Sequence, residues 1–302
     1  MNRVKEIIHC NEVHSQGIKG NDIGIAILDT GISNHPDFEN RIIAFKDILH
    51  DKLSLYDDSG HGTHVGGITS GNGIASKFLY TGVAPSANII SVKVLDHRGN
   101  GSIVDVLKGI EWILANRYKY NIRIINISVG MTPKKGDEEK TKLLLEGVEY
   151  AWDKGFVVVT AAGNNGPKSY SITTPGISRS VITVGSSDDE KITDRVSGTK
   201  TNYSSRGPTL SCICKPDIVT PGSSITSCNS KFDRRTPQFY CKKSGTSMAT
   251  PVVSGAIALL LSKYPDMNNL EVKMRLRECA VDLGLPRNQQ GWGLLDVQKL
   301  LK

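Results

Sequence analysis

Three residues that lie far apart in the sequence could together perform nucleophilic catalysis. Asp29 ends the apolar run GIAILD, His61 lies in the glycine-rich segment SGHGTHVGG, and Ser247 lies in KSGTSMATP. A serine hydroxyl is a poor nucleophile until a neighbouring base removes its proton, and a carboxylate can orient a histidine for that task. Taken singly, an aspartate at a strand end or a serine before a helix is most often a cap. The three residues therefore indicate a site only when they are considered together.

A second histidine competes with His61 for the role of base. His64 follows three residues later, and an HxxH pair can also bind a metal ion. No third ligand and no glutamate base accompany this pair, so the sequence does not favour a metal site. Because His61 is expected at the exposed start of a helix and His64 one turn inside it, we predict that His61 is functional and His64 structural.

An asparagine could complete the site. Asn164 lies in VVVTAAGNNG, where an asparagine is ordinarily a turn residue. Beside a serine nucleophile, its side-chain amide would become a donor to a developing oxyanion. Ser247 is itself expected at the start of a long apolar helix, where free amides and the helix dipole favour negative charge. The Gly-x-Ser-x-Gly turn of α/β-hydrolases is absent at Ser247.

Apolar β-branched runs alternate with helical patterns along the chain. This alternation predicts an α/β fold, a three-layer sandwich with a mainly parallel central sheet flanked by helices. The predicted strands are Ile23–Asp29, Arg41–Lys46, Ile89–Leu95, Ile122–Ser128, Phe156–Ala161, Val181–Gly185 and Asp217–Thr220. The predicted helices are Thr63–Ser70, Ser102–Ala115, Lys140–Lys154, Thr246–Lys263 and Leu270–Cys279.

The predicted sheet also indicates where a ligand would bind. In parallel sheets, ligands bind beyond the carboxyl ends of the strands, and Asp29, Ser128 and Asn164 all fall at or after such ends. The Ser-, Thr-, Gly- and Pro-rich stretch 187–235 is interpreted as loops with short strands, and no linker separates it from the rest. We therefore expect one domain over residues 1–302, with residues 1–20 as an N-terminal extension that packs on the core.

Composition narrows the range of partners. With 302 residues, of which 38% are hydrophobic, the chain is large enough to bury a core without disulfides or metals. The net charge of +7 comes from basic residues mixed with acidic ones, which favours an ordinary surface over nucleic-acid binding. No CxxC pair or zinc spacing appears, so free thiols in a reducing compartment are favoured. The six cysteines are Cys10, Cys212, Cys214, Cys228, Cys241 and Cys279.

Neither a leader nor a membrane span is evident in the chain. The first residues, MNRVKEIIHCNEVHSQG, lack the apolar core of a signal peptide, and the apolar run around Gly255–Leu261 is too short to cross a bilayer. The expected location is cytoplasmic without membrane association, or secreted if a leader has been removed.

The order Asp, His, Ser is that of subtilisin among the known catalytic triads. The segments AILDTGISNHPDF, GHGTHVGGI, GVAPSANIISVKVL, INISVG, TAAGNNG, YSSRGP, KPDIVTPG, SGTSMATP and GWGLLDV resemble successive motifs of the subtilisin-like family (subtilases, peptidase family S8). They run from about residue 20 to residue 297, which is nearly the whole chain. The chain is most similar to an intracellular or pro-domain-less bacterial member.

The resemblance implies a serine endopeptidase. Ser247 would be the nucleophile, His61 the base and later the acid, and Asp29 the residue that orients His61. The Asn164 amide and the Ser247 backbone N–H would form the oxyanion hole. No cofactor is required, although weakly bound calcium or sodium is compatible with the family.

The resemblance also implies how a substrate binds. Family members pair an extended peptide with two backbone segments. The pocket for the residue before the cut would contain no charge, so we expect an apolar or aromatic preference, and Thr173 stands where a glycine often lies, which would make the pocket shallower. The implied binding residues are Asn100, Gly101, Ser102, Ser128, Val129, Gly130, Ala161, Ala162, Gly163 and Thr173.

Three features depart from the family pattern. Val252 follows Pro251 where many members carry histidine, a change that should not affect the chemistry. The loop Gly71–Tyr80 contains Lys77 and does not resemble the calcium loop of secreted subtilisins. No pro-domain is recognisable, so we hypothesise that residues 1–20 pack on the surface and influence activity.

Other functions remain compatible with the same fold. A pseudoprotease would need to lack a triad residue, and all three are present. Acyl transfer to an amine would use the same acyl-enzyme and would differ from hydrolysis only in its products. We expect peptide or protein substrates, a monomer, and no nucleic-acid partner.

Overall fold

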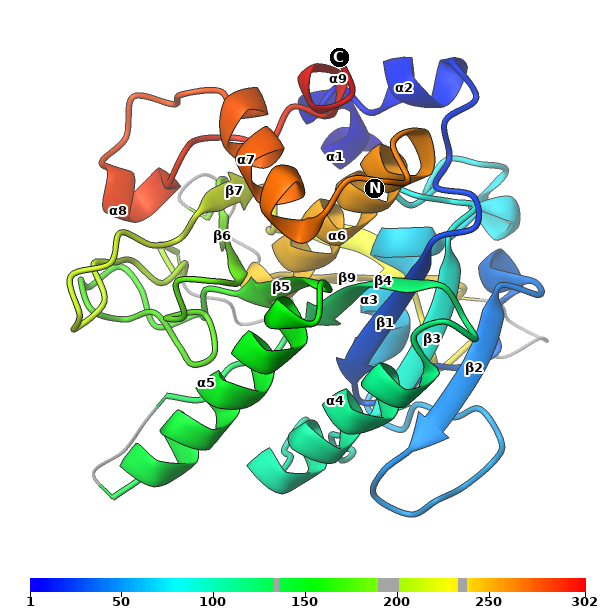
Figure 1. Cartoon of the computed structure of the whole chain (residues 1–302). Helices are drawn as coiled ribbons and strands as arrows, with labels where there is room; N and C mark the ends of the chain where they lie inside the picture. The colour runs from blue at the N-terminus through cyan, green and yellow to red at the C-terminus, as the bar shows by residue number, and fades with distance from the viewer. Residues whose placement is uncertain (133–135, 190–200, 233–237) are drawn as a thin grey trace.

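A central sheet organises the chain in the computed structural model, which describes residues 1–132, 136–189, 201–232 and 238–302. Its seven strands run in the order β2-β3-β1-β4-β5-β6-β7, and every neighbouring pair is parallel (Figure 1). The strands are β1 (Gly24–Asp29), β2 (Ile42–Asp47), β3 (Asn88–Lys93), β4 (Ile122–Ile127), β5 (Val157–Ala161), β6 (Ile182–Ser186) and β7 (Ile218–Thr220).

Four long helices cover the two faces of this sheet. Helices α4 (Ile103–Asn116) and α5 (Glu138–Asp153) lie on one face, and α3 (His61–Ser70) and α6 (Thr246–Lys263) lie on the other (Figure 1). The alternation of side chains along a strand explains the two cores, because successive residues point to opposite faces. In β1, Ile25 and Ile27 pack with α3 and α6, whereas Ala26 and Leu28 pack with α4 and α5.

The predicted three-layer α/β fold is confirmed. Each predicted strand and long helix is present, with ends displaced by no more than two residues. Helix α3 begins at His61, two residues before the predicted start. The fifth long helix, α7 (Asn269–Cys279), begins with a capping box in which Asn268 and Glu271 exchange hydrogen bonds.

Helix α6 is the apolar centre of one core. Its 18 residues are long and apolar enough to span a bilayer, but 83% of them are buried inside the fold, as in a core helix of a folded domain. Residues Val252–Leu261 of α6 are all buried. The helix is therefore accounted for by packing against the sheet.

Several short elements were not predicted. Strand β8 (Ile225–Cys228) lies within the stretch 187–235 that was interpreted as loops with short strands, and it forms an antiparallel hairpin with β9 (Tyr240–Lys243), which lies beyond that stretch. Residues 190–200 and 233–235 of that stretch lie outside the described residues. The other short elements are α1 (Asn2–Ile7), α2 (Asn11–Ser15), η1 (Pro36–Phe38), η2 (Ile74–Ser76), α8 (Arg287–Gln290) and α9 (Val297–Leu300).

The N-terminal segment, residues 1–20, contains helices α1 and α2. Val4, Ile8 and Val13 are buried and belong to the core that contains α3 and α6. The Val297 amide donates to the Ile8 carbonyl at 2.8 Å, which joins the two ends of the chain. Helices α1 and α2 accordingly lie beside α9 (Figure 1).

Candidate active site

The strand order reverses around β1, and this reversal defines a crevice. The chain passes from β1 to β2 and β3 on one side of β1 and then crosses to β4 on its other side, so a crevice opens outside the carboxyl end of β1. Asp29 is the last residue of β1, and His61 is the first residue of α3. Ser247 is the second residue of α6 and is partly exposed.

Asp29 and His61 form a close pair. His61 Nδ1 lies 2.7 Å from Asp29 Oδ1 and 2.9 Å from Oδ2. The Asp29 side chain is 1% exposed, whereas the His61 side chain is 25% exposed. Asp29 Oδ1 also accepts a hydrogen bond from the Thr30 amide at 2.7 Å. Since Nδ1 donates to the carboxylate, Nε2 is the His61 nitrogen that remains able to take up a proton.

The charge of Asp29 outweighs the effect of burial on His61. Burial alone would lower the pKa of His61, and the positive charge of Lys243 acts in the same direction. The negative charge of Asp29 and its hydrogen bond raise the pKa, and the net result is a pKa above the ordinary value. This environment stabilises the imidazolium form that a general base must become.

Asp57 is a buried carboxylate that sequence reasoning missed. Its Oδ1 accepts from the Thr30 hydroxyl at 2.8 Å and from the Gly60 amide at 2.7 Å. Its Oδ2 accepts from the Thr63 amide at 2.8 Å and from the Thr63 hydroxyl at 2.6 Å. The Thr30 hydroxyl in turn accepts from the Gly62 amide at 2.9 Å. Asp57 thus fixes the turn after Asp29 against the start of α3. In the sequence, the only feature that could have indicated this role is its position four residues before His61.

His64 has different surroundings. It is fully buried, and its Nε2 donates to the carbonyl groups of Ile225 at 3.0 Å and Cys241 at 3.3 Å. Burial, together with the positive charge of Lys243, lowers the pKa of His64 to about 3. A histidine that stays neutral in this way holds α3 against the β8–β9 hairpin.

The turn before Ser247 requires a glycine. Gly245 has a φ of 143°, and its amide donates to the Gly222 carbonyl at 2.9 Å. A Cβ at this position would lie 3.2 Å from Asn164 Nδ2. Gly245 therefore allows the Asn164 side chain to approach the start of α6, where the first amides have no partner within the helix.

Asn164 is oriented by Thr246, which is another residue that sequence reasoning missed. Asn164 Oδ1 accepts from the Thr246 amide at 3.0 Å and from the Thr246 hydroxyl at 3.1 Å. The Thr246 hydroxyl also accepts from the Gly163 amide at 3.1 Å. These bonds hold the Asn164 oxygen toward the helix, and Nδ2 makes no hydrogen bond to any other described residue.

A cavity of about 260 Å³ separates the two segments that were predicted to pair with a substrate. Asn100, Gly101 and Ser102 line one side, and Val129 and Gly130 line the other. Apolar side chains form most of the remaining wall, among them Val106, Ile127 and Leu144. The other predicted binding residues, Ser128, Ala161, Ala162, Gly163 and Thr173, do not line this cavity.

Thr173 fills the space between two glycines. It is 4% exposed, and its hydroxyl donates to the Ala162 carbonyl at 3.2 Å. A Cβ at Gly130 would lie 2.2 Å from Thr173 Oγ1, and a Cβ at Gly163 would lie 2.5 Å from Thr173 Cγ2. Both walls of the predicted pocket therefore meet the Thr173 side chain.

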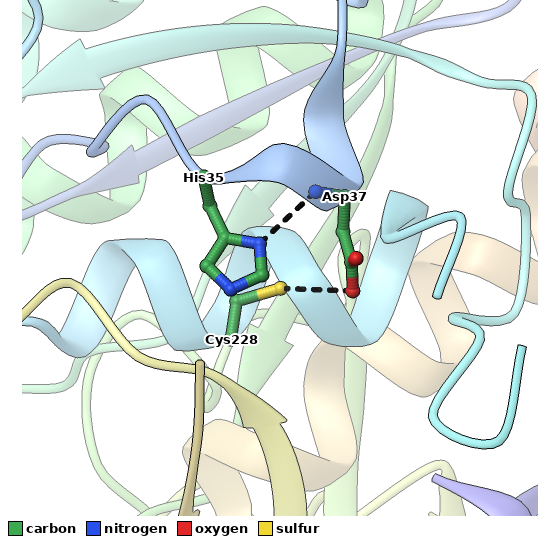
Figure 2. A group of neighbouring side chains, drawn as sticks. All are labelled: His35, Asp37 and Cys228. Carbon is green, nitrogen blue, oxygen red and sulfur yellow. Dashed lines mark hydrogen bonds between the residues drawn. The ribbon is translucent and has the colours of Figure 1, made fainter. Parts of the chain in front are cut away.

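Among the described residues, one group of buried side chains could ligate a metal ion, and it lies between η1 and the β8–β9 hairpin. His35, Asp37 and Cys228 lie within reach of one another (Figure 2). His35 Nδ1 accepts from the Asp37 amide at 3.1 Å, and His35 Nε2 donates to the Phe239 carbonyl at 2.8 Å. Asp37 Oδ2 accepts from the Tyr240 hydroxyl at 2.6 Å and from the Cys228 thiol at 3.7 Å. Because these groups satisfy one another, the cluster is explained as a hydrogen-bonded joint between η1 and the hairpin.

The loop Gly71–Tyr80 is likewise held by groups of the chain. Asp37 Oδ1 accepts from the Ala75 amide at 2.9 Å, and the Asp37 carbonyl accepts from the Asn72 amide at 2.9 Å. Lys77 ends η2 in a left-handed conformation. Asp37 therefore anchors this loop to η1.

Comparison with known proteins agrees with this geometry. The Subtilase family model matches residues 20–293. Serine protease AprX of Bacillus subtilis is 42% identical over 90% of this chain, and Subtilisin Savinase of Lederbergia lenta is 33% identical over 94% of this chain and 93% of its own length. The chain spans 64% of the length of AprX.

Solved structures agree as well. The structure of Sphericase superposes with a TM-score of 0.76 at 30% identity and covers 93% of each chain. A cold adapted subtilisin-like serine proteinase gives a TM-score of 0.72 at 28% identity. The chain belongs to the subtilase family.

Proposed function

We propose that the chain is a serine endopeptidase that hydrolyses peptide bonds through an acyl-enzyme. The observation that carries this proposal is the Asp29–His61 pair, whose side chains are 2.7 Å apart, together with Ser247 as the second residue of α6. Ser247 Oγ attacks the peptide carbonyl carbon while His61 Nε2 accepts the hydroxyl proton. Asp29 holds the resulting imidazolium in place.

The second half of the reaction reverses these roles. His61 gives its proton to the leaving amine as the C–N bond breaks, and an ester to Ser247 remains. A water molecule then attacks this ester as His61 removes one of its protons, and His61 returns that proton to Ser247 Oγ as the acyl C–O bond breaks and the acid product leaves. These steps use only groups of the chain and water, so the proposed mechanism requires no cofactor.

The oxyanion formed in both halves is proposed to lie between Asn164 Nδ2 and the Ser247 backbone amide. The hydrogen bonds that fix Asn164 Oδ1 on Thr246 support this role, because they hold the side chain at the start of α6 and leave Nδ2 without a partner among the described residues. Losing one such donor raises the barrier by ~2.7–4 kcal/mol, a magnitude that was measured in subtilisin itself.

The preference for particular substrate side chains is proposed to follow from the absence of charged residues among the predicted substrate-binding residues. An extended peptide would pair with segments 100–102 and 128–130, and the residue before the cut would enter a pocket walled by segments 128–130 and 161–163. The buried Thr173 side chain supports a shallow pocket. A peptide library should show an apolar or aromatic preference before the cut, and a profile dominated by Arg or Asp there would overturn this proposal.

Residues 1–20 are proposed to belong to the same catalytic unit and to support its nucleophile. Arg3 pairs with Asp188 at 2.8 Å, and Asp188 Oδ1 accepts from the Gly222 amide at 2.8 Å. The Gly222 carbonyl accepts from Gly245. Arg3→Gln should therefore lower kcat, whereas Glu6→Gln, which changes an exposed residue of the same helix, should not. Equal activity in both variants would contradict this role.

The compartment is proposed to be the cytoplasm. All six cysteines are free, which supports a reducing environment. One relative is named Minor extracellular protease Epr, so the opposite location is a real alternative. Fractionation of the source cells decides between them, and recovery of the chain from the medium would contradict the proposal.

The direct test of the proposed nucleophile is labelling with a serine-directed fluorophosphonate, followed by intact-mass analysis. The wild-type chain should gain one adduct and lose activity, whereas Ser247→Ala should gain none. Ser262→Ala is the matched control, because Ser262 lies on the same helix and is partly exposed. Adduct formation on Ser247→Ala, or none on the wild type, would contradict the proposal.

A further inference from the structure

A second cavity, of about 470 Å³, lies between the N-terminal segment and the loops that follow α3. We call it the N-terminal pocket. None of the described residues that line it is acidic. Three basic residues and three hydroxyl-bearing residues line it, and those used below are Lys5, His14, Lys19 and Ser86.

Lys5 is the residue that needs an explanation. It lies on α1 and is only 7% exposed. Buried lysines are almost always paired with a carboxylate, because desolvating an ammonium group is costly. Among the described residues, none makes a hydrogen bond or an ion pair with the Lys5 side chain. Lys5 therefore lines the pocket as a basic residue that has no partner among the described residues.

Lys19, an exposed residue that also lines the pocket, adds a second positive charge. Burial lowers the pKa of Lys5. Burial also lowers the pKa of His14, and the positive charges of Lys5 and Lys19 lower it further. His14 Nε2 donates to the Val83 carbonyl at 2.8 Å, which holds the ring at the pocket. These groups repel one another, and a bound anion would relieve that repulsion.

We propose that the N-terminal pocket binds an oxyanion of the phosphate type. Lys5 and Lys19 supply the positive charge, and the hydroxyl group of Ser86 supplies a neutral donor. The anion joins α1 and α2 to the segment between α3 and β3, so it fastens the N-terminal segment to the catalytic core. This site is separate from the crevice at Asp29 and does not depend on the proposed peptidase activity.

Titration calorimetry with inorganic phosphate tests the proposal. The measurement uses the full chain carrying Ser247→Ala, which prevents self-digestion, at constant ionic strength with chloride as the reference anion. We expect saturable binding of one phosphate per chain and a higher Tm in phosphate than in chloride. Heats that do not saturate, or equal effects of phosphate and chloride, would overturn the proposal.

Variants that remove one lysine charge each test whether phosphate binds in the N-terminal pocket. Lys5→Gln and Lys19→Gln should each weaken phosphate binding about tenfold, which is the loss of one charge-assisted contact. Lys108→Gln removes one charge from the exposed face of α4 and should leave the affinity unchanged. If Lys5→Gln does not fold, Lys19→Gln decides, because Lys19 is exposed and can be replaced without unfolding. Equal weakening by all three variants would show general charge screening and would overturn the proposal.

The source of the phosphate group is distinguished in a parallel titration with free phosphoserine. Tighter binding of phosphoserine than of inorganic phosphate would assign the pocket to phosphate monoesters, and tighter binding of inorganic phosphate would assign it to the free ion. Either result retains the proposed chemistry, whereas binding of neither compound would contradict it.

Discussion

His61 and His64 lie on the same helix three residues apart, yet the fold gives them opposite properties. His61 is partly exposed, pairs with Asp29 and has a raised pKa. His64 is fully buried, donates to two carbonyl groups and has a pKa of about 3. The difference comes from what faces each ring, because a carboxylate stabilises the charged imidazole and a buried carbonyl pair stabilises the neutral one. Within one HxxH motif, the partner therefore decides which histidine can exchange a proton near neutral pH.

Removing the His61 side chain should produce the largest loss of kcat. In His61→Ala, Ser247 loses its base, and kcat should fall about a millionfold, as was found for subtilisin itself. The Tm should change little, because His61 is partly exposed. Single-turnover kinetics on an apolar peptide ester, with Tm from calorimetry, would measure both quantities. A loss of less than a hundredfold would show that another group acts as the base.

Removing the charge of Asp29 should produce the second-largest loss of kcat. Asp29→Asn keeps the size of the side chain but removes the carboxylate that raises the pKa of His61. We expect kcat to fall about 10⁴-fold, with the acid limb of the pH profile moving to lower pH. An unchanged acid limb would mean that Asp29 does not control the His61 proton.

A smaller effect is expected at Asn164. Asn164→Ala removes the proposed oxyanion donor but leaves the Asp29–His61 pair intact, so kcat should fall about 10²–10³-fold with little change in KM. Asn165→Ala is a matched control, because Asn165 is the next residue and its amide group bonds Thr132 at 2.7 Å. Equal losses in the two variants would indicate a general disturbance of this loop.

His64→Ala should affect stability rather than chemistry. The substitution leaves a cavity and strands the carbonyl groups of Ile225 and Cys241, so the free energy of unfolding should fall by about 2–4 kcal/mol. Denaturant unfolding on the Ser247→Ala background measures this change. The kcat of the folded His64→Ala enzyme should stay within about tenfold of wild type, and a millionfold loss would reverse the assignment of the two histidines.

The last prediction concerns how the free energy of unfolding depends on acid pH. The pKa of His64 is about 3 in the folded chain and about 6.5 when unfolded, so protons bind the unfolded state first. His64 therefore contributes stability above pH 6.5 that is lost as the pH falls from about 6.5 toward 3. The unfolding free energy of His64→Ala should decline less steeply across this window than that of the parent chain. Parallel slopes would mean that His64 is not the titrating group.

The long elements could be predicted because their patterns are strong. The apolar runs of the strands and of the 18-residue helix α6 can be recognised from the local sequence alone. Asp29, His61 and Ser247 lie in glycine-containing motifs at the ends of these strands and helices. The β8–β9 hairpin has no such pattern, since β9 is half exposed and reads YCKK. Its strands are identified only by their pairing across the intervening chain.

The supporting residues could not be predicted because their roles depend on distant partners. Asp57 matters through amides and hydroxyls from both Thr30 and Thr63, and no spacing rule indicates that these groups converge. The charge on Lys5 is notable only because Lys19 and His14 share its pocket and none of the described residues that line this pocket is acidic. Local sequence gives the type of a side chain, whereas its burial and its partners come from the fold.

The most direct test is the titration of both histidine rings by NMR on the Ser247→Ala chain. His61 should titrate above its ordinary value of about 6.5, and Asp29→Asn should lower that midpoint. His64 should remain neutral down to about pH 3 or until the chain unfolds. Two rings that titrate together near 6.5, or a His61 midpoint that does not respond to Asp29→Asn, would contradict the account.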